Sequence, residues 1–445
     1  MRHSRPERTL LVLTLIAGVA SARGAVAQVA APARAATAPP APAIAIVGAR
    51  VYPVSGPMME NATVVIRDGK IAAVGTNIAI PADARRIDGS GKWVTPGLIN
   101  SSTQLGLSEI GQVIETVEGA APGKDSIAAA FRVWEGFNAA SVLLAPNRNE
   151  GVTSVMIVPS GGLVAGQAAV VDLNEGTLAS MLRRAPVAMV AQLGNSAQGG
   201  TGARGELIMR MRELLDEAKV YGARTARGAQ RPDPTAFEIS RSDLEAMKPV
   251  LSGQLPMIIN ADMASDIEAA LRIAADYNIR IMIGGGAEAW RVADKLAAAR
   301  VPVLTGAMNN IPGTFSSLGA RQENAALLRR AGVNVLLVGA GGEAFNVRNV
   351  RQEAGNAVAY GMSWDDALRA VTLAPAEAFG IAAQVGTIQA GRDANVVVWS
   401  GDPFEFSTRA EQVFIRGLDV KAPSRQDMLI ERYKTLPPSY RPPAR

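Results

Sequence analysis

Polar side chains stand at the ends of several short apolar runs in this chain. Asn260 and Asp262 close the run that begins at Pro256, and Glu288 comes shortly after the run IRIMIG. Two carboxylates that neighbouring strands project toward one cavity could act as an acid and base pair. Together with Gln104, these oxygen atoms could instead bind a hard cation such as Ca²⁺ or Mg²⁺, or could simply hydrogen-bond one another in a polar cavity.

The residue types that the sequence lacks limit its chemistry further. It contains no cysteine, and its single histidine is His3, which lies in a segment that we expect to be removed. Disulfides and thiolate or imidazole ligands for zinc are therefore absent from the mature chain. A serine nucleophile such as Ser102 or Ser160 would need a lysine as its base, and no lysine follows a predicted strand.

Two glycine-rich stretches are predicted to be loops. The stretch GTGARG at 200–205 fits G-x-G-x-x-G and could hold an anion at a helix N-terminus. The acidic residue that a dinucleotide site requires about 20 positions further on is missing. The stretch PSGGLVAGQ at 159–167 is the second. We expect both at the mouth of the fold, either as a lid or as plain turns.

Strand and helix patterns alternate from Gly97 onward. Short apolar runs occupy residues 153–158, 187–193, 256–260, 279–284, 301–306 and 333–339. Between them, helical spacing places Leu207, Met211 and Leu214 on one face, and Ser242 with Glu245 and Ser363 with Asp366 are expected to cap later helices. This repetition predicts an α/β fold built on a TIM-type (β/α)8 barrel, whose functional residues lie at the C-terminal strand ends.

The stretch 96–106 reads PGLINSSTQLG and follows alternating, strand-like runs from 43 to 94 that include the turn DGKI. This pattern resembles the amidohydrolase superfamily of imidazolonepropionase- and dipeptidase-like metal hydrolases, in which P-G-L-I-D-x-H-T-H carries two metal-binding histidines. The C-terminal stretch GTIQAGRDANVVVW resembles the closing segment of that family, with Asn395 where an Asp is usual. The resemblance implies a small composite β-sandwich from 43–95 and 384–420 beside a barrel of 96–383.

The chain departs from the family pattern at every metal-binding position. Asn100 stands where the family has Asp, and Ser102 and Gln104 stand where it has the two histidines. The bridging lysine, the histidines of the fifth and sixth strands and the aspartate of the eighth are replaced within 191–193, 260–264, 284–286 and 339–341. The resemblance thus predicts no metal and no other cofactor. The candidate substrate-binding residues are Ser102, Gln104, Asn260, Asp262 and Glu288, and the catalytic residues are unknown.

The N-terminal 27 residues have the form of a secretory signal peptide. A basic start is followed by an apolar stretch and by the small-residue site Ala25–Ala27. Removing residues 1–27 takes away four arginines and one glutamate, so that the formal net charge falls from +5 to +2. We expect a periplasmic or secreted protein with an Ala/Pro-rich linker at 28–42, a C-terminal tail at 421–445 and no membrane attachment after cleavage. The scattered basic residues favour no nucleic acid.

Two functional hypotheses follow from these observations. In the first, the protein is a non-catalytic or degenerate subunit that binds a small ligand or forms a homo- or hetero-oligomer with an amidohydrolase relative. In the second, it is a hydrolase of carbon–nitrogen bonds in peptide-like or other amides, with an atypical site. The family resemblance points to an enzyme, whereas the missing metal site points away from one.

Overall fold

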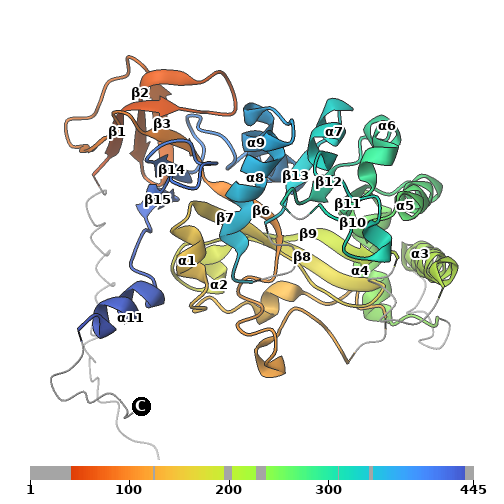
Figure 1. Cartoon of the computed structure of the whole chain (residues 1–445). Coiled ribbons are helices and arrows are strands. Elements are labelled where there is room, and N and C mark those ends of the chain that lie inside the picture. Colours follow the sequence, from red (N-terminus) through yellow and green to blue (C-terminus); the bar gives the residue numbers. More distant parts are fainter. Residues whose placement is uncertain are drawn as a thin grey trace, which may run out of the picture. The chain divides into compact units, whose positions relative to one another are not determined.

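The computed structural model describes residues 42–123, 126–194, 203–226, 237–308, 310–339 and 344–435. The predicted signal peptide, nearly all of the predicted linker and the tail beyond 435 lie outside these residues. The described chain forms two sheets, a β-rich one and a barrel sheet flanked by helices (Figure 1). Within the described part, no helix is both long and apolar enough to cross a membrane.

The β-rich sheet joins strands from both ends of the chain. Its order is β16-β15-β14-β5-β1-β2-β3, with β4 also paired to β1. The two ends meet where β14 runs antiparallel to β5, with Val396 opposite Pro96. A separate core of residues such as Ile46, Val64 and Phe414 supports this sheet. Its strands are β1 (Ile44–Val51), β2 (Met59–Arg67), β3 (Lys70–Gly75), β4 (Arg85–Asp88), β5 (Trp93–Pro96), β14 (Val396–Trp399), β15 (Ala410–Ile415) and β16 (Leu418–Asp419).

The barrel sheet has eight strands in the order β13-β12-β11-β10-β9-β8-β7-β6, and β13 approaches β6 so that the sheet nearly closes. Each of the six apolar runs predicted as strands overlaps one of these strands, which confirms the α/β barrel. The strands are β6 (Leu98–Thr103), β7 (Val152–Ile157), β8 (Val164–Asp172), β9 (Leu182–Gln192), β10 (Met257–Ala261), β11 (Ile281–Gly285), β12 (Val303–Thr305) and β13 (Val335–Leu337).

Strand β8 differs from the predicted pattern. It pairs antiparallel with both β7 and β9, whereas the other neighbouring pairs in this sheet are parallel. The reason is the short connection 158–163, because a few residues can join antiparallel strands but a parallel pair needs a long crossover. The stretch 159–167, predicted to be a loop, therefore becomes β8 from Val164 onward, and only 159–163 remains at the barrel mouth.

Helices cover the outside of the barrel strands (Figure 1). The face of α3 predicted from Leu207, Met211 and Leu214 is buried, and Ser363 accepts the Asp366 backbone N–H as predicted. The cap of α4 lies two residues earlier than predicted, since Ser240 accepts from Asp243. The helices are α1 (Leu144–Arg148), α2 (Leu178–Met181), α3 (Arg204–Ala226), α4 (Arg241–Leu251), α5 (Ala264–Tyr277), α6 (Ala293–Ala298), α7 (Asn324–Arg330), α8 (Val350–Ala359), α9 (Trp364–Ala370), α10 (Leu373–Ala378) and α11 (Arg425–Tyr433).

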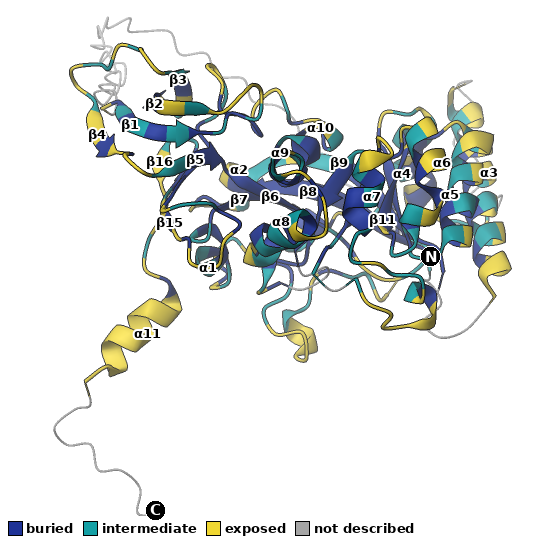
Figure 2. Cartoon of the chain, turned by 45° about the horizontal axis from the view of Figure 1, so that its top comes forward, coloured by how far each residue is buried: buried dark blue, intermediate teal, exposed yellow. Residues whose placement is uncertain are grey.

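Apolar side chains fill the interior of the barrel. Ile99, Met156, Ile258, Met282 and Leu336, from five different strands, belong to one buried cluster. Figure 2 shows the barrel strands as buried and α11, near the C-terminal end of the described chain, as exposed. Because the interior is packed, a ligand reaches only the ends of the barrel.

A buried ionic network joins the barrel to the β-rich sheet. The Asp172 carboxylate at the end of β8 is fully buried and accepts hydrogen bonds from Ser154 Oγ at 2.7 Å and from Arg183 Nε at 2.8 Å. Arg416, which follows β15, donates its Nε to the same carboxylate at 2.8 Å. Arg183 also binds Asp393 at 2.8 Å. Residues far apart in the sequence therefore share one carboxylate.

Candidate functional site

A cavity of about 440 Å³ opens at the C-terminal ends of the barrel strands. We call it the mouth cavity. Its floor is apolar and includes Met156, Val190, Ile258 and Leu304. Hydroxyl, amide and carboxylate groups line its walls, and the described lining contains no lysine or arginine. These polar residues are Ser102, Gln104, Ser160, Gln192, Asn260, Asp262, Thr305, Asn310 and Glu353.

A bulge in β6 places Ser102 and Gln104 at the mouth cavity. Between Asn100 and Thr103 the strand advances three residues while β7 advances only two, from Val155 to Ile157. A bulge of this kind changes which side chains face the barrel interior. Gln104 is almost fully buried and donates its amide Nε2 to the Val158 carbonyl at 2.6 Å.

Asn100 has a structural role for which its amide is needed. Its Nδ2 donates to the carbonyls of Gly339 at 3.2 Å and Val347 at 3.1 Å, while its Oδ1 accepts from the Ser102 backbone N–H at 3.2 Å. The side chain thus links β6 to the chain that follows β13. A carboxylate could not donate to either carbonyl.

Replacing Asn100 with Asp should therefore destabilise the fold. The change leaves two buried carbonyls without a donor and buries a charge among acceptors, so we expect a loss of about 3 kcal/mol in the free energy of unfolding. Chemical denaturation of both proteins measures it. Asn61→Asp, at an exposed position of the β-rich sheet, is the matched control, and equal stability of the Asn100 variant and the wild type would contradict the assignment.

Asn260 and Asp262 require glycines on the neighbouring strand. A Cβ atom at Gly284 would lie 2.0 Å from Asn260 Oδ1, and one at Gly285 would lie 2.6 Å from Asp262 Oδ1. Gly285 also has a φ of +78°, which side-chain-bearing residues rarely adopt. The end of β11 is therefore bare because the polar side chains at the end of β10 take its space.

Among the carboxylates that line the mouth cavity, Asp262 is the one whose negative charge is least offset by neighbouring groups. Burial raises the pKa of Asp262 above its ordinary value. A hydrogen bond from the Ala287 backbone N–H, at 3.3 Å, opposes this increase, while the nearby charges of Asp266 and Glu288 add to it. The site therefore favours a ligand that donates hydrogen bonds or carries positive charge.

Glu288 does not line the mouth cavity, although the sequence suggested that it should. Its carboxylate accepts from the backbone N–H of Ala264 at 3.1 Å, at the start of α5, and from that of Gly319 at 3.0 Å. These bonds turn it away toward the loop after β12. The Glu288 carboxylate therefore holds two segments together, and its charge adds to the raised pKa of Asp262.

Glu353, which was not predicted from the sequence, reaches the mouth cavity from α8. Its side chain is almost fully buried, and Oε2 accepts from the backbone N–H groups of Ala307 at 2.5 Å and Met308 at 2.7 Å. These bonds hold the loop after β12. The signal that could have found it is an acidic residue on the apolar face of a helix, in line with Val350, Ala354 and Ala357.

Part of the other predicted features lies outside the described residues. This holds for Ala340 and Gly341 after β13 and for 195–202, which contain the start of the G-x-G-x-x-G stretch. Arg204, which begins α3, binds Asp266 at 3.2 Å. Ser160 lines the mouth cavity and its Oγ donates to the Gly119 carbonyl at 3.3 Å, so that no base holds it as a nucleophile.

The fold and sequence are similar to those of known amidohydrolases. The model of the amidohydrolase family matches residues 210–421. An amidohydrolase from Thermotoga maritima MSB8 superimposes with a TM-score of 0.77 and 27% identity, over 85% of this chain and 99% of that one. The chain belongs to the amidohydrolase superfamily.

Two curated relatives extend the similarity within the amidohydrolases. An imidazolonepropionase from Acidiphilium cryptum is 27% identical over 78% of this chain and 89% of its own length. Amidohydrolase tasK from Hapsidospora irregularis is 24% identical over 76% of this chain but only 37% of its own length. The chain thus spans most of one relative and little more than a third of the other.

The residues that line the mouth cavity do not fit a catalytic transition metal. Within the described residues, no three Asp or Glu side chains gather as a potential metal site, and the sequence has no histidine after residue 3. Amides and hydroxyls bind zinc poorly compared with imidazole and thiolate. The donor groups suit hydrogen bonding to an organic ligand instead.

Proposed function

We propose that this protein is an exported amidohydrolase-superfamily member that binds a small cationic or amide-bearing molecule and has lost metal-dependent hydrolysis. The observation that carries the proposal is the donor set of the mouth cavity, in which amides, hydroxyls and carboxylates occupy the strand ends. A metal hydrolase must lower the pKa of bound water from ~15.7 to about 7, and imidazole and carboxylate ligands hold the ion that does so.

The cavity chemistry supports this choice of ligand. Asp262 supplies negative charge that no lysine or arginine in the described lining offsets. The amides of Gln104 and Asn260 can both donate and accept, which suits an amide group. The apolar floor can hold an aliphatic part of the same molecule. By binding a ligand in this way, the protein would act as a ligand-binding subunit, alone or in an oligomer with a catalytic relative.

A second function is favoured by one observation. Asp262 and Glu353 line the same cavity, and a pair of carboxyls that face one cavity can share acid and base roles. The alternative is thus a carbon–nitrogen hydrolase that works without a transition metal. Turnover of dipeptides or cyclic amides by chelator-treated protein, abolished in Asp262→Asn, would favour this alternative over the binding protein.

The metal content of the purified protein tests the loss of metal-dependent chemistry. We expect mature protein, dialysed without chelator, to hold well under one equivalent of zinc, manganese, iron or nickel per chain. Elemental analysis by mass spectrometry measures it, with a histidine-containing amidohydrolase purified in parallel as the control. A content near one zinc per chain would contradict the proposal.

A further inference from the structure

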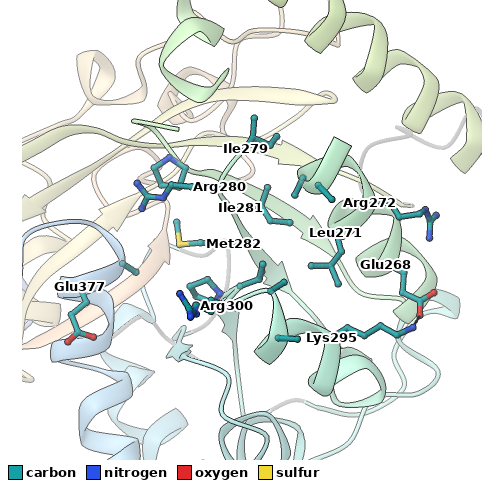
Figure 3. Close-up of a pocket in the computed structure, with 18 residues that line it drawn as sticks. Glu268, Leu271, Arg272, Ile279, Arg280, Ile281, Met282, Lys295, Arg300 and Glu377 are labelled. Carbon is teal, nitrogen blue, oxygen red and sulfur yellow. Dashed lines mark hydrogen bonds and ion pairs between the residues drawn. The ribbon is translucent and has the colours of Figure 1, made fainter. Parts of the chain in front are cut away.

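Figure 3 shows a second cavity, of about 830 Å³. Its lining includes the residues just before β10, β11 and β12, so it lies at the opposite end of the barrel from the mouth. We call it the basal groove. Its walls are α5, α6 and the residues that lead into three strands, such as Pro256 before β10 and Pro302 before β12. The N-terminal ends of the strands thus form its floor, so nothing that binds there can touch the mouth cavity.

The basal groove exists because small side chains face it. Ala274 and Ala275 of α5 and Ala298 at the end of α6 line it, and α6 spans only six residues. Longer side chains or a longer helix would cover the floor. The floor itself is apolar, with Leu271, Ile279 and Ile281 among its residues. A ligand here gains mainly from burying aliphatic surface.

The charges around the groove are unequal. Its two glutamates already have partners, since Glu268 binds Lys295 at 2.5 Å and Glu377 binds Arg369 at 2.5 Å. Within the described residues, Arg280 and Arg300 make no ion pair, and Arg280 donates only to the Gly253 carbonyl at 3.2 Å. The groove therefore has positive charge to offer to an anion.

The arrangement of these groups gives the groove a polar end and an apolar length. Figure 3 shows Arg280 and Arg300 on either side of Met282 at one end. From there Ile281 and then Leu271 lead toward the far end, where Lys295 meets Glu268. One anionic group can thus lie between two guanidinium groups while a chain attached to it crosses the apolar floor.

We propose that the basal groove binds a single-chain anionic amphiphile, an alkyl chain that ends in a carboxylate. The carboxylate lies between Arg280 and Arg300, and the chain lies over Ile281 and Leu271. Exposed ion pairs contribute little free energy alone, so the chain supplies most of the affinity and the arginines set the preference for an anion. This site is independent of the mouth cavity and of the function proposed for it.

Titration calorimetry of the intact protein with decanoate and with uncharged decanamide tests the proposal. We expect wild type to bind one decanoate per chain and Arg280→Ala/Arg300→Ala to bind it at least fivefold more weakly, with decanamide affinity unchanged. Arg86→Ala/Arg409→Ala, at two exposed positions that form no ion pair within the described residues, is the matched charge control and should bind decanoate normally. Asp262→Asn should also bind it normally, because its mouth cavity lies at the other end.

A groove-filling variant completes the test. Ala275 is exposed on α5, so Ala275→Trp should fold and should abolish decanoate binding. If this variant fails to fold, as circular dichroism would show, the arginine pair alone decides the outcome. No decanoate binding by wild type, or equal affinity in the double arginine variant, would overturn the proposal.

Discussion

Asp172→Ala is expected to lower the free energy of unfolding by about 3–5 kcal/mol, because it removes a buried carboxylate that the buried Arg183 guanidinium and Arg416 both bind. The Asp172 carboxylate is fully buried and binds Arg183 and Arg416 together with Ser154. The Arg183 side chain is 2% exposed, so water cannot replace the lost partner. Denaturant unfolding monitored by circular dichroism measures the loss.

Asp83→Ala is the matched control for this variant. Asp83 binds Arg67 at 2.8 Å, but the side chains of this pair are 59% and 43% exposed. Exposed pairs contribute about 0–1 kcal/mol, so the control should be nearly as stable as the wild type. Similar small losses in both variants would show that the buried network does not stabilise the contact between the barrel and the β-rich sheet.

Asp262→Asn is expected to weaken the binding of a cationic ligand by at least tenfold at neutral pH. Truncating a buried charge partner typically costs about 2–5 kcal/mol of binding free energy. A thermal-shift screen of amines, dipeptides and cyclic amides identifies the probe, and calorimetry with the best hit measures the change. The affinity of wild type should also fall in acid, as Asp262 takes up its proton above the ordinary pKa of an aspartate.

The ligand affinity of Glu288→Gln distinguishes the observed position of Glu288 from the position predicted from the sequence. If the carboxylates of Asp262 and Glu288 both faced the mouth cavity, Asp262→Asn and Glu288→Gln would lose ligand affinity to a similar extent. In the structure Glu288 binds the backbone of Ala264 and Gly319 instead, so Glu288→Gln should lose stability and keep its ligand affinity. Equal affinity of wild type and Asp262→Asn for the ligand would place it outside the mouth cavity.

The pH dependence of stability gives an independent readout for Asp262. Its pKa is raised in the folded state, so the folded protein disfavours the charged form. This cost is absent below the unfolded pKa, grows as the pH rises from the unfolded to the folded pKa, and stays constant above the folded pKa. Asp262→Asn should therefore be more stable than wild type at neutral pH, and the difference should vanish in acid. If the difference in the free energy of unfolding between Asp262→Asn and wild type were the same at neutral and acid pH, this would contradict the raised pKa of Asp262.

The sequence by itself determined the fold class. Apolar runs with strand and helix periods are local signals, and six of them overlap six of the eight barrel strands. The absence of cysteine, and of histidine beyond residue 3, is also complete in the sequence. It limits the chemistry of the protein wherever the side chains lie, because no fold can supply a missing imidazole.

Only the tertiary structure decided which polar residues share the mouth cavity. Glu288 lies near the end of a strand, yet two backbone N–H groups draw it away from the cavity, and Glu353 enters from a helix that the strand-end rule ignores. The reversal of β8 likewise depends on its neighbours, β7 and β9. Such outcomes depend on distant partners competing for the same hydrogen bonds and space, and the period of a local sequence carries no record of that competition.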